Sequence, residues 1–537
     1  MVKNREFRQK MVDIEKSMMQ KYFLLCLITT GFFARVPETN AQSTFTQENS
    51  RLEPQHQIEF TENSEVNNLL ISQAAPITVP SGEGETISEI EIRFVDQKGN
   101  PTEGKTKPDI ITREFELQPG DTYNAELAQK GLDRVNQLVI VEKATLNLEA
   151  SGSSDRVVMV VQVEETSQFF YTFSSTLNPP TALNGSTRPL TVVPMSNKAR
   201  GLSAGARVGM NNLGGNNQSL TLGIEVGTSI IGLDLDYRKF LKQDTGYAVN
   251  LFTRNSAEPE FDGGDRDVNL INGDDPWVDR VGAGVEFFRP IKGDLQGALG
   301  LNYQLVSIRE EAFSSSLEPL DQLGNQLSFS DDGQDVLVTV NFVTSLDKRN
   351  STSNTTDGYR FLFETDQSIP VGESDILYNR LAANYTKYMP LSLFGFNEGP
   401  RTLVLNIQGG TIIGDVPPYE AFILGGSSSV RGYSSAELGS ARSFVQTTAE
   451  YRFPIFSKTA FKKEFDVGGT LFIDYATDLG SGDTVTGEPG EVRDKPGYGF
   501  GYGAGLRTLT PIGIVRLDLG LNDQGETNII FGIGERF

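Results

Sequence analysis

The side chains that most often perform catalysis are almost absent from this chain. Its 537 residues include one histidine, His56, and one cysteine, Cys26. His56 lies in a polar stretch where we expect it to be solvated, and Cys26 lies in an apolar run near the N-terminus. The chain after His56 has no histidine and no cysteine, so it cannot contain a Ser-His-Asp set, a cysteine nucleophile or a Cys/His zinc site. We expect no enzymatic activity, no cofactor and no metal site, and we expect the acidic segments 262–267 and 331–335 to be solvated rather than bound to Ca²⁺.

The net charge and a glycine-rich stretch are the other features of the sequence that could indicate a function. The chain has 70 acidic and 47 basic residues, which gives a net charge of -23. A protein that binds nucleic acid needs the opposite balance, so we expect no nucleic acid partner. One glycine-rich stretch superficially resembles a phosphate-binding loop, but it lacks the Gly-Lys-Ser/Thr ending and its strict alternation fits a β-strand. Five glycines on one face of that strand would form a smooth groove that another backbone can approach closely: Gly497, Gly499, Gly501, Gly503 and Gly505.

The elements that must position these residues are strands of alternating character, which begin near residue 168 and continue to residue 537. For example, Leu220, Leu222 and Ile224 share one face of a strand, while Thr221 and Gly223 lie on the other. About sixteen such segments occur, and long polar connections alternate with short ones, as in outer-membrane barrels. Soluble β-sandwiches and β-helices also alternate, but they rarely do so over such a length. The sequence therefore predicts a mainly β fold, a 16-stranded transmembrane antiparallel β-barrel over residues 167–537.

Residues 86–166 have the pattern of a small α/β domain with the order β-α-α-β-β. Strands are expected over Ile87–Val95, Glu142–Glu149 and Arg156–Glu164, and helices over Pro108–Leu117 and after Asn124, which can cap the second helix. This order leaves one edge of the sheet free. An exposed edge can accept an extended partner strand through backbone hydrogen bonds.

The N-terminal segment has the layout of a secretory signal peptide over residues 1–41. The apolar run Tyr22–Ala34 is flanked by Lys10 and Lys21, and Thr39-Asn40-Ala41 supplies small residues for cleavage before Gln42. A membrane anchor is the alternative, but the run is short for a membrane helix. Residues 42–85 are polar and lack periodicity, so they are expected to form a disordered linker.

The last strand is an apolar comb that ends in an aromatic residue. Ile529, Phe531, Ile533 and Phe537 are expected to share the lipid-facing side of the strand. Such an ending resembles the signal by which assembly machinery recognises a barrel. By the same alternation Glu535 would lie on this side, near the lipid headgroups, where a charge costs less than at the membrane centre.

One stretch carries the most specific resemblance. The segment Gly425–Tyr433 contains Val430, Arg431, Gly432 and Tyr433, and it falls between the eleventh and twelfth expected strands. It resembles the BamA and TamA superfamily of outer-membrane assembly factors, whose corresponding loop carries Val-Arg-Gly-Phe/Tyr. The resemblance implies that this loop folds into the lumen and that Arg431 meets Asp474, in Phe472-Ile473-Asp474, on the inner wall of strand thirteen. Alternation places Phe472 and Asp474 on the lumen side. The alternative is an ordinary loop arginine that points toward lipopolysaccharide.

The small domain is similar to a POTRA domain of the same superfamily. The similarity rests on Gly99-Asn100, on residues 118–121 and on residues 161–165. The amino-acid sequence of residues 92–112 is most similar to the cyanobacterial and plastid branch. Only one such domain is visible, whereas assembly factors of this superfamily usually carry several.

The resemblance implies an outer-membrane protein insertase, or assembly factor, with its POTRA-like domain in the periplasm of a cyanobacterial-type cell. Its POTRA edge would capture strands of unfolded outer-membrane or secreted client proteins, and the barrel would insert them at a seam between its first and last strands. Membrane lipid and accessory assembly subunits are the other expected partners. A dedicated secretion or import pore of the same superfamily is the first alternative, and a passive porin is the second.

Overall fold

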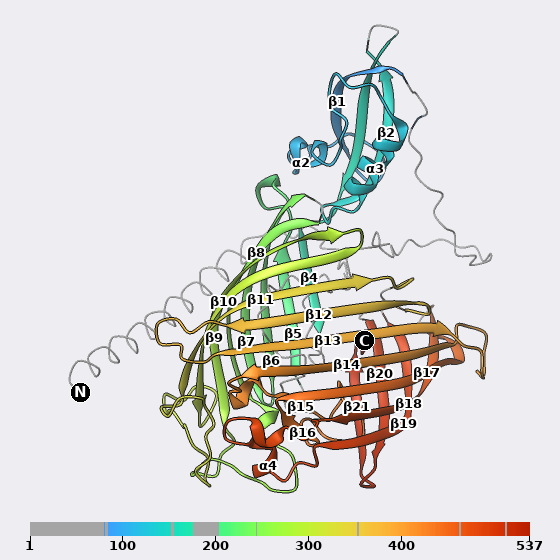
Figure 1. Ribbon diagram of the computed structural model, residues 1–537. Helices are drawn as coiled ribbons and strands as arrows, with labels where there is room; N and C mark the ends of the chain where they lie inside the picture. The colour runs from blue at the N-terminus through green and yellow to red at the C-terminus, as the bar shows by residue number, and fades with distance from the viewer. Residues whose placement is uncertain are drawn as a thin grey trace. The chain divides into compact units, whose positions relative to one another are not determined.

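The computed structural model describes residue 80 and residues 84–151, 155–174, 203–242, 244–351, 354–460, 463–510 and 513–537. The expected signal peptide and most of the expected linker, with Cys26 and His56, lie outside these residues. The described elements form a three-stranded sheet with two helices, and a separate 16-stranded sheet (Figure 1). No helix in this part of the chain combines the length and the apolar character of a membrane span.

The small domain has the expected β-α-α-β-β order. It consists of β1 (Thr86–Val95), α2 (Pro108–Thr112), α3 (Ala125–Asn136), β2 (Val141–Ala150) and β3 (Arg156–Glu165). In the sheet β3 is central, parallel to β1 and antiparallel to β2. One apolar core joins the sheet to the helices, and it includes Ile87, Ile111, Leu132, Val135, Leu146 and Val161.

One of the two helices of this domain has the predicted start, whereas the other is shorter than predicted. Asn124 caps α3 as predicted, since its side chain accepts a hydrogen bond of 2.9 Å from the backbone N–H of Leu127. The prediction that the first helix continues to Leu117 is wrong, because α2 ends at Thr112. Phe115 and Leu117 are nevertheless buried. The core needed apolar side chains at these positions without requiring a helix, so apolar spacing alone could not locate the helix end.

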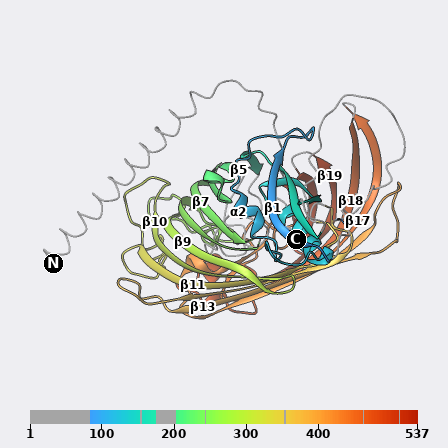
Figure 2. The same ribbon diagram turned by 90° about the horizontal axis from the view of Figure 1, so that it is seen from above.

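The large sheet has sixteen strands in consecutive order, which confirms the predicted count, and every neighbouring pair is antiparallel. Figure 2 shows the sheet curving back on itself, with β9–β13 between the two ends. Its strands are β4 (Phe169–Ser174), β5 (Ser203–Met210), β6 (Gln218–Gly227), β7 (Ile230–Lys242), β8 (Thr245–Ala257), β9 (Trp277–Lys292), β10 (Leu295–Arg309), β11 (Gln334–Asp347), β12 (Gly358–Ser368), β13 (Tyr378–Pro390), β14 (Thr402–Gly414), β17 (Ser443–Ala460), β18 (Lys463–Thr477), β19 (Tyr498–Thr510), β20 (Gly513–Asn522) and β21 (Thr527–Ile533).

Alternation along these strands separates two surfaces. On β18, Leu471, Ile473 and Tyr475 are exposed on the outer face, whereas Phe472 and Asp474 are buried on the inner face. The outer face is therefore apolar and suited to hydrocarbon, and the inner face carries the charged and polar side chains.

Connections between the strands contribute an apolar core at one end of the barrel. The connection between β14 and β17 contributes the short strands β15 (Phe422–Leu424) and β16 (Gly439–Ala441), which pair with each other. The connection before β19 contributes Lys495, whose Nζ donates a hydrogen bond of 2.9 Å to Ser440 Oγ. Burial and the neighbouring positive charge of Arg493 lower the pKa of Lys495 to about 7. The apolar core contains side chains from five connections: Phe261, Leu270, Leu327, Ile376, Val416, Tyr419, Phe422, Leu424, Val430, Tyr433, Leu438 and Val485.

Candidate functional site

The loop that carries the Val-Arg-Gly-Tyr segment folds into the lumen and approaches the barrel wall. It joins β14 to β17, the eleventh and twelfth strands of the large sheet. Gly432 has a φ of +111°, a conformation that side chains other than glycine adopt rarely. A Cβ at this position would lie 2.7 Å from the backbone carbonyl carbon of Leu521 in β20. The turn therefore needs glycine both for its backbone angle and for its close approach to the wall.

The structure brings Arg431 and Asp474 together as a fully buried ion pair. The guanidinium donates to the carboxylate through Nε over 2.8 Å and through Nη2 over 3.1 Å, and the backbone N–H of Arg431 adds a bond of 3.1 Å. Arg431 is 1% exposed and Asp474 is 0% exposed. The ring of Phe472 lies beneath the guanidinium, with the guanidinium carbon 3.4 Å from the ring centre. This geometry excludes the alternative of an arginine that points outward.

Val430 and Tyr433 hold the loop on either side of this pair. Val430 is buried in the apolar core of the connections. The hydroxyl of Tyr433 donates to Asp523 between β20 and β21, and its backbone oxygen accepts a bond of 3.0 Å from Asn528 of β21. The four residues of the segment thus contact β18 and the β20–β21 hairpin together.

The predicted glycine groove is only partly a contact surface for the loop. A Cβ on Gly501 would overlap the backbone oxygen of Arg431, and one on Gly499 would lie 2.6 Å from the Tyr433 hydroxyl. Gly503 and Gly505 are instead crowded by β20 and β18, and Gly497 precedes β19 in a turn with a φ of +78°. The prediction that all five line a groove for the loop is therefore wrong. Gly520 of β20, which the sequence reading missed, lies against Gly432.

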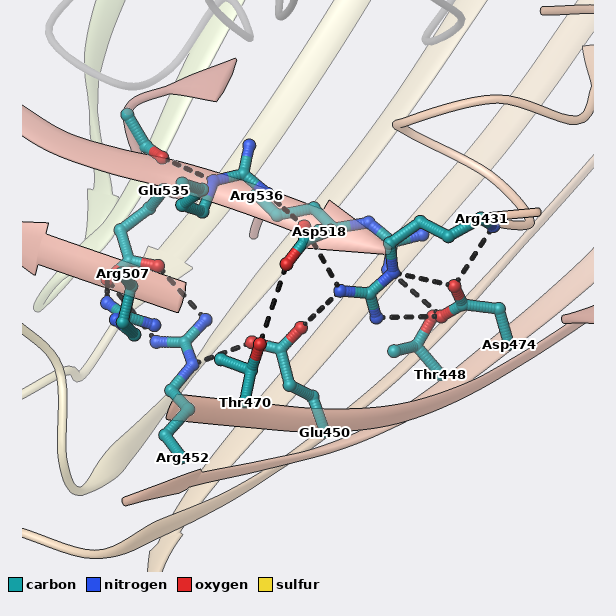
Figure 3. A network of polar contacts seen from close by, with 12 residues as sticks. Arg431, Thr448, Glu450, Arg452, Thr470, Asp474, Arg507, Asp518, Glu535 and Arg536 are labelled. Carbon is teal, nitrogen blue, oxygen red and sulfur yellow. Dashed lines mark hydrogen bonds and ion pairs between the residues drawn. The ribbon is translucent and has the colours of Figure 1, made fainter. Parts of the chain in front are cut away.

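Sequence reasoning also missed the charged residues that surround the pair (Figure 3). Glu450 of β17 accepts from Arg431 Nη1 over 2.7 Å and from Arg452 Nε over 2.8 Å. Asp518 of β20 lies 3.6 Å from Arg431 Nη1, and Thr448 donates to Asp474 over 2.8 Å. Alternation alone would have placed Thr448, Glu450 and Arg452 on the inner face, because they occupy every second position of one strand.

The end of the chain departs most from the prediction. Phe531 is exposed on the outer face as expected, and the side chain of Ile533 lies outside what the structure describes. The prediction that Phe537 shares that face is wrong, since Phe537 is buried with Tyr388 and Val404. The placement of Glu535 near the headgroups is also wrong, because its carboxylate pairs with Arg452 and Arg507 inside the barrel. Gly534, with a φ of +103°, turns the backbone inward after β21.

A 16-stranded barrel whose loop is tied by a buried arginine to the inner wall, together with a β-α-α-β-β domain, is the architecture of a class of outer-membrane barrels. A family model described as the Omp85 superfamily domain matches residues 212–537. The chain belongs to the Omp85 superfamily, in which the BamA and TamA assembly factors resembled by its loop are also found.

Curated relatives lie in the plastid branch of this superfamily. The chain is 31% identical over 459 residues to outer envelope protein 80 of Arabidopsis thaliana, which covers 84% of this chain and 57% of the relative. It is 27% identical over 483 residues to protein TOC75 of Pisum sativum, covering 84% and 56% respectively. The chain thus spans less than two thirds of these relatives. A solved structure of BamA from Haemophilus ducreyi lacking POTRA domains 1–3 has the same fold, with a TM-score of 0.60, 16% identity, and coverage of 84% of this chain and 85% of that one.

Proposed function

We propose that this protein inserts client proteins into an outer membrane at a seam between β4 and β21. The observation that carries the proposal is the weakness of this seam. β21 has only 7 residues, and no backbone ladder joins it to the described residues of β4 at the other end of the sheet. Unpaired backbone groups are costly in hydrocarbon, and an incoming client strand can satisfy them.

The free sheet edge of the small domain supports capture of an extended client. The outer edge of β1 is partly occupied, since Ile87 exchanges backbone bonds with Gly120 and Asp121. On β2, the side chain of Asn136 satisfies both backbone groups of Ala144, with bonds of 2.7 and 3.2 Å. Because outward-facing backbone alternates along a strand, the positions beyond Ala144 in β2 offer the longer template for strand addition.

A photo-crosslinking amino acid at Asn147 is therefore expected to capture unfolded outer-membrane clients. Asn147 is exposed on β2, within the stretch proposed to accept the client. The crosslinked products are measured by mass spectrometry after irradiation of cells. The same amino acid at Glu126, exposed on α3, serves as the matched control and is expected to capture few clients. Equal capture from both positions would count against the β2 edge.

Depletion of the protein followed by a census of outer-membrane and secreted proteins tests the proposed function. A general loss of barrel proteins supports an insertase. Loss of a single secreted or imported protein would instead support a dedicated pore, which the single β-α-α-β-β domain among the described residues favours. In either role we place the barrel in the outer membrane of a cyanobacterial-type cell, with the small domain in the periplasm, because the curated relatives are chloroplast outer-envelope proteins by name.

The apolar core of the connections argues against a passive porin. The intact protein is expected to conduct ions poorly in a planar bilayer, because a cluster of apolar side chains from the connections is buried at that end of the lumen. Deleting residues 425–440 removes Val430, Tyr433 and Leu438 from this core and is expected to raise the conductance several-fold. Replacement of the exposed Ile271 with serine is the control and should leave the conductance unchanged. A stable open conductance of the intact protein would favour the porin.

A further inference from the structure

The segment that follows β21, Gly534–Phe537, is held inside the barrel, and residues 535–537 make polar contacts with four strands. Glu535 pairs with Arg452 Nη2 of β17 over 3.0 Å and with Arg507 Nη2 of β19 over 2.6 Å. Arg536 donates to Asp474 of β18 over 2.9 Å and also to the backbone oxygen of Ser429 in the inward loop. The hydroxyl of Tyr388 in β13 donates to the Phe537 oxygen over 3.1 Å.

Alternation explains why this segment leaves the strand. If β21 continued in its register, Glu535 would point to the same side as Ile529 and Phe531, which are exposed on the lipid face. A carboxylate on that side is destabilising, whereas the inner wall offers two arginines. Gly534 permits the change of direction because it lies in the left-handed region of backbone conformation. Its N–H still bonds to Ile514 of β20 over 2.7 Å, so the turn occurs at the last ladder position.

We propose that residues 534–537 form an internal latch that couples the last strand of the seam to the inward loop. Glu535 is the positioning residue that retains the segment in the lumen. Arg536 places a second guanidinium on Asp474, the carboxylate that already holds Arg431. The end of β21 and the loop therefore share one buried acceptor, so that movement of either changes the charge environment of the other.

With the latch in place, every carboxylate of the network faces at least one guanidinium group. The segment contributes one carboxylate and one guanidinium, so its departure would leave the net charge of the lumen unchanged but would redistribute it. Arg452 would retain Glu450, Arg507 would lose Glu535, and Asp474 would lose Arg536. Buried charges without partners are destabilising, which favours the latched state until another group replaces these contacts.

The latch also sets the length of the seam strand. The ladder between β20 and β21 ends at Val515 and Ile533, although β20 begins at Gly513. Release of the segment would allow β21 to lengthen along β20 and would alter the edge that a client strand meets. This last consequence rests on the proposed function, whereas the latch itself does not.

Fluorescence quenching by lipid distinguishes a latched segment from a membrane-facing one. Phe537→Trp is introduced into a Trp277→Phe background, so that the full chain has a single tryptophan. The protein is folded into phosphatidylcholine vesicles with normal or dibrominated acyl chains. We expect little quenching of this tryptophan by the brominated lipid. Ile529→Trp in the same background is the lipid-facing reference, because Ile529 is exposed on the outer face, and it is expected to be quenched strongly.

Removal of the Glu535 carboxylate is expected to release the segment. Glu535→Leu should raise the quenching of Trp at 537 by about twofold or more, whereas Glu535→Gln, which keeps an acceptor for the arginines, should change it less. Glu311→Leu, at an exposed position of a connection, is the matched control and should have no effect. Heat-dependent migration on SDS gels verifies that each variant is folded.

A second measurement does not rely on a disruptive change. With Cys26→Ser, the pair Val404→Cys and Phe537→Cys should be joined by a short bis-maleimide, because both side chains lie in one buried cluster. The latch is overturned if Trp at 537 is quenched as strongly as Trp at 529 in the parent, or if the cysteine pair does not crosslink. Neither measurement uses a client, so a negative result leaves the proposed function standing, and the depletion experiment is independent of the latch.

Discussion

Replacing Asp474 with leucine is expected to detach the inward loop and to abolish most of the insertion activity. Asp474 accepts from Arg431, Arg536 and Thr448, and it is inaccessible to water. Its loss would leave the facing guanidinium groups without their shared carboxylate in a buried site, a change that typically costs about 3–5 kcal/mol. Limited proteolysis of the connection 415–442 and the cellular level of barrel proteins would measure the two effects.

The companion variants separate the contribution of each partner. Arg431→Ala should be less damaging than Asp474→Leu, because Asp474 keeps Arg536 and Glu450 keeps Arg452. Arg431→Lys retains the charge but not the planar fork that contacts Asp474 through two nitrogens, so it should rescue only part of the function. If Asp474→Leu leaves both the protease resistance of the loop and the level of barrel proteins unchanged, the lock has no part in the function.

Adding one methyl group at Gly501 is expected to displace the loop almost as effectively. A Cβ at this position would overlap the backbone oxygen of Arg431, and backbone atoms cannot move aside as a flexible side chain can. Overpacking of a well-packed site costs about 1–3 kcal/mol, and we expect the upper end of that range for Gly501→Ala. The measurements are the same: protease sensitivity of the loop and the level of barrel proteins.

Gly232 provides the matched control for this substitution. It lies within β7 of the same sheet, but a Cβ there would meet its nearest neighbour, the Cβ of Glu225, at an ordinary 3.6 Å. Gly232→Ala is therefore expected to be tolerated. Equal loss from both variants would mean that the sheet tolerates no added methyl group, rather than that Gly501 has a particular role beside the loop.

Most of the barrel could be predicted from the sequence, but only part of the candidate site. The sixteen strands were predictable because hydrocarbon outside and polar groups inside select opposite side chains at every second residue, as in Leu471–Tyr475. The loop position and the approach of Arg431 to Asp474 followed from a resemblance, since no local rule relates residues that are far apart in the chain. Alternation could have placed Glu450 and Arg452 on the inner face of one strand, but not their partners on other segments, Arg431 and Glu535.

The end of the chain could not be predicted by the same rule. Alternation identifies faces only while the backbone stays extended, and it assigned Phe537 to lipid because nothing in the pattern marked Gly534 as a turn. The charge of Glu535 was the available signal, since a carboxylate on a lipid-facing position conflicts with the rest of that face. Likewise, the close contacts of Gly501 and Gly520 with the loop depend on where a distant backbone lies, which a count of glycines does not reveal.

The burial of the network around Asp474 has a consequence for how the protein responds to ionic strength. Mobile ions weaken interactions between charges only where they can approach them, within a screening length of about 8 Å at physiological salt. The pair between Arg93 and Glu149 on the small domain, whose side chains are 37% and 49% exposed, lies within their reach. The buried pair between Arg431 and Asp474 lies outside the reach of mobile ions. High ionic strength would therefore weaken the electrostatic contacts of the water-exposed domain, while the buried ion pair that holds the loop in the barrel stays intact.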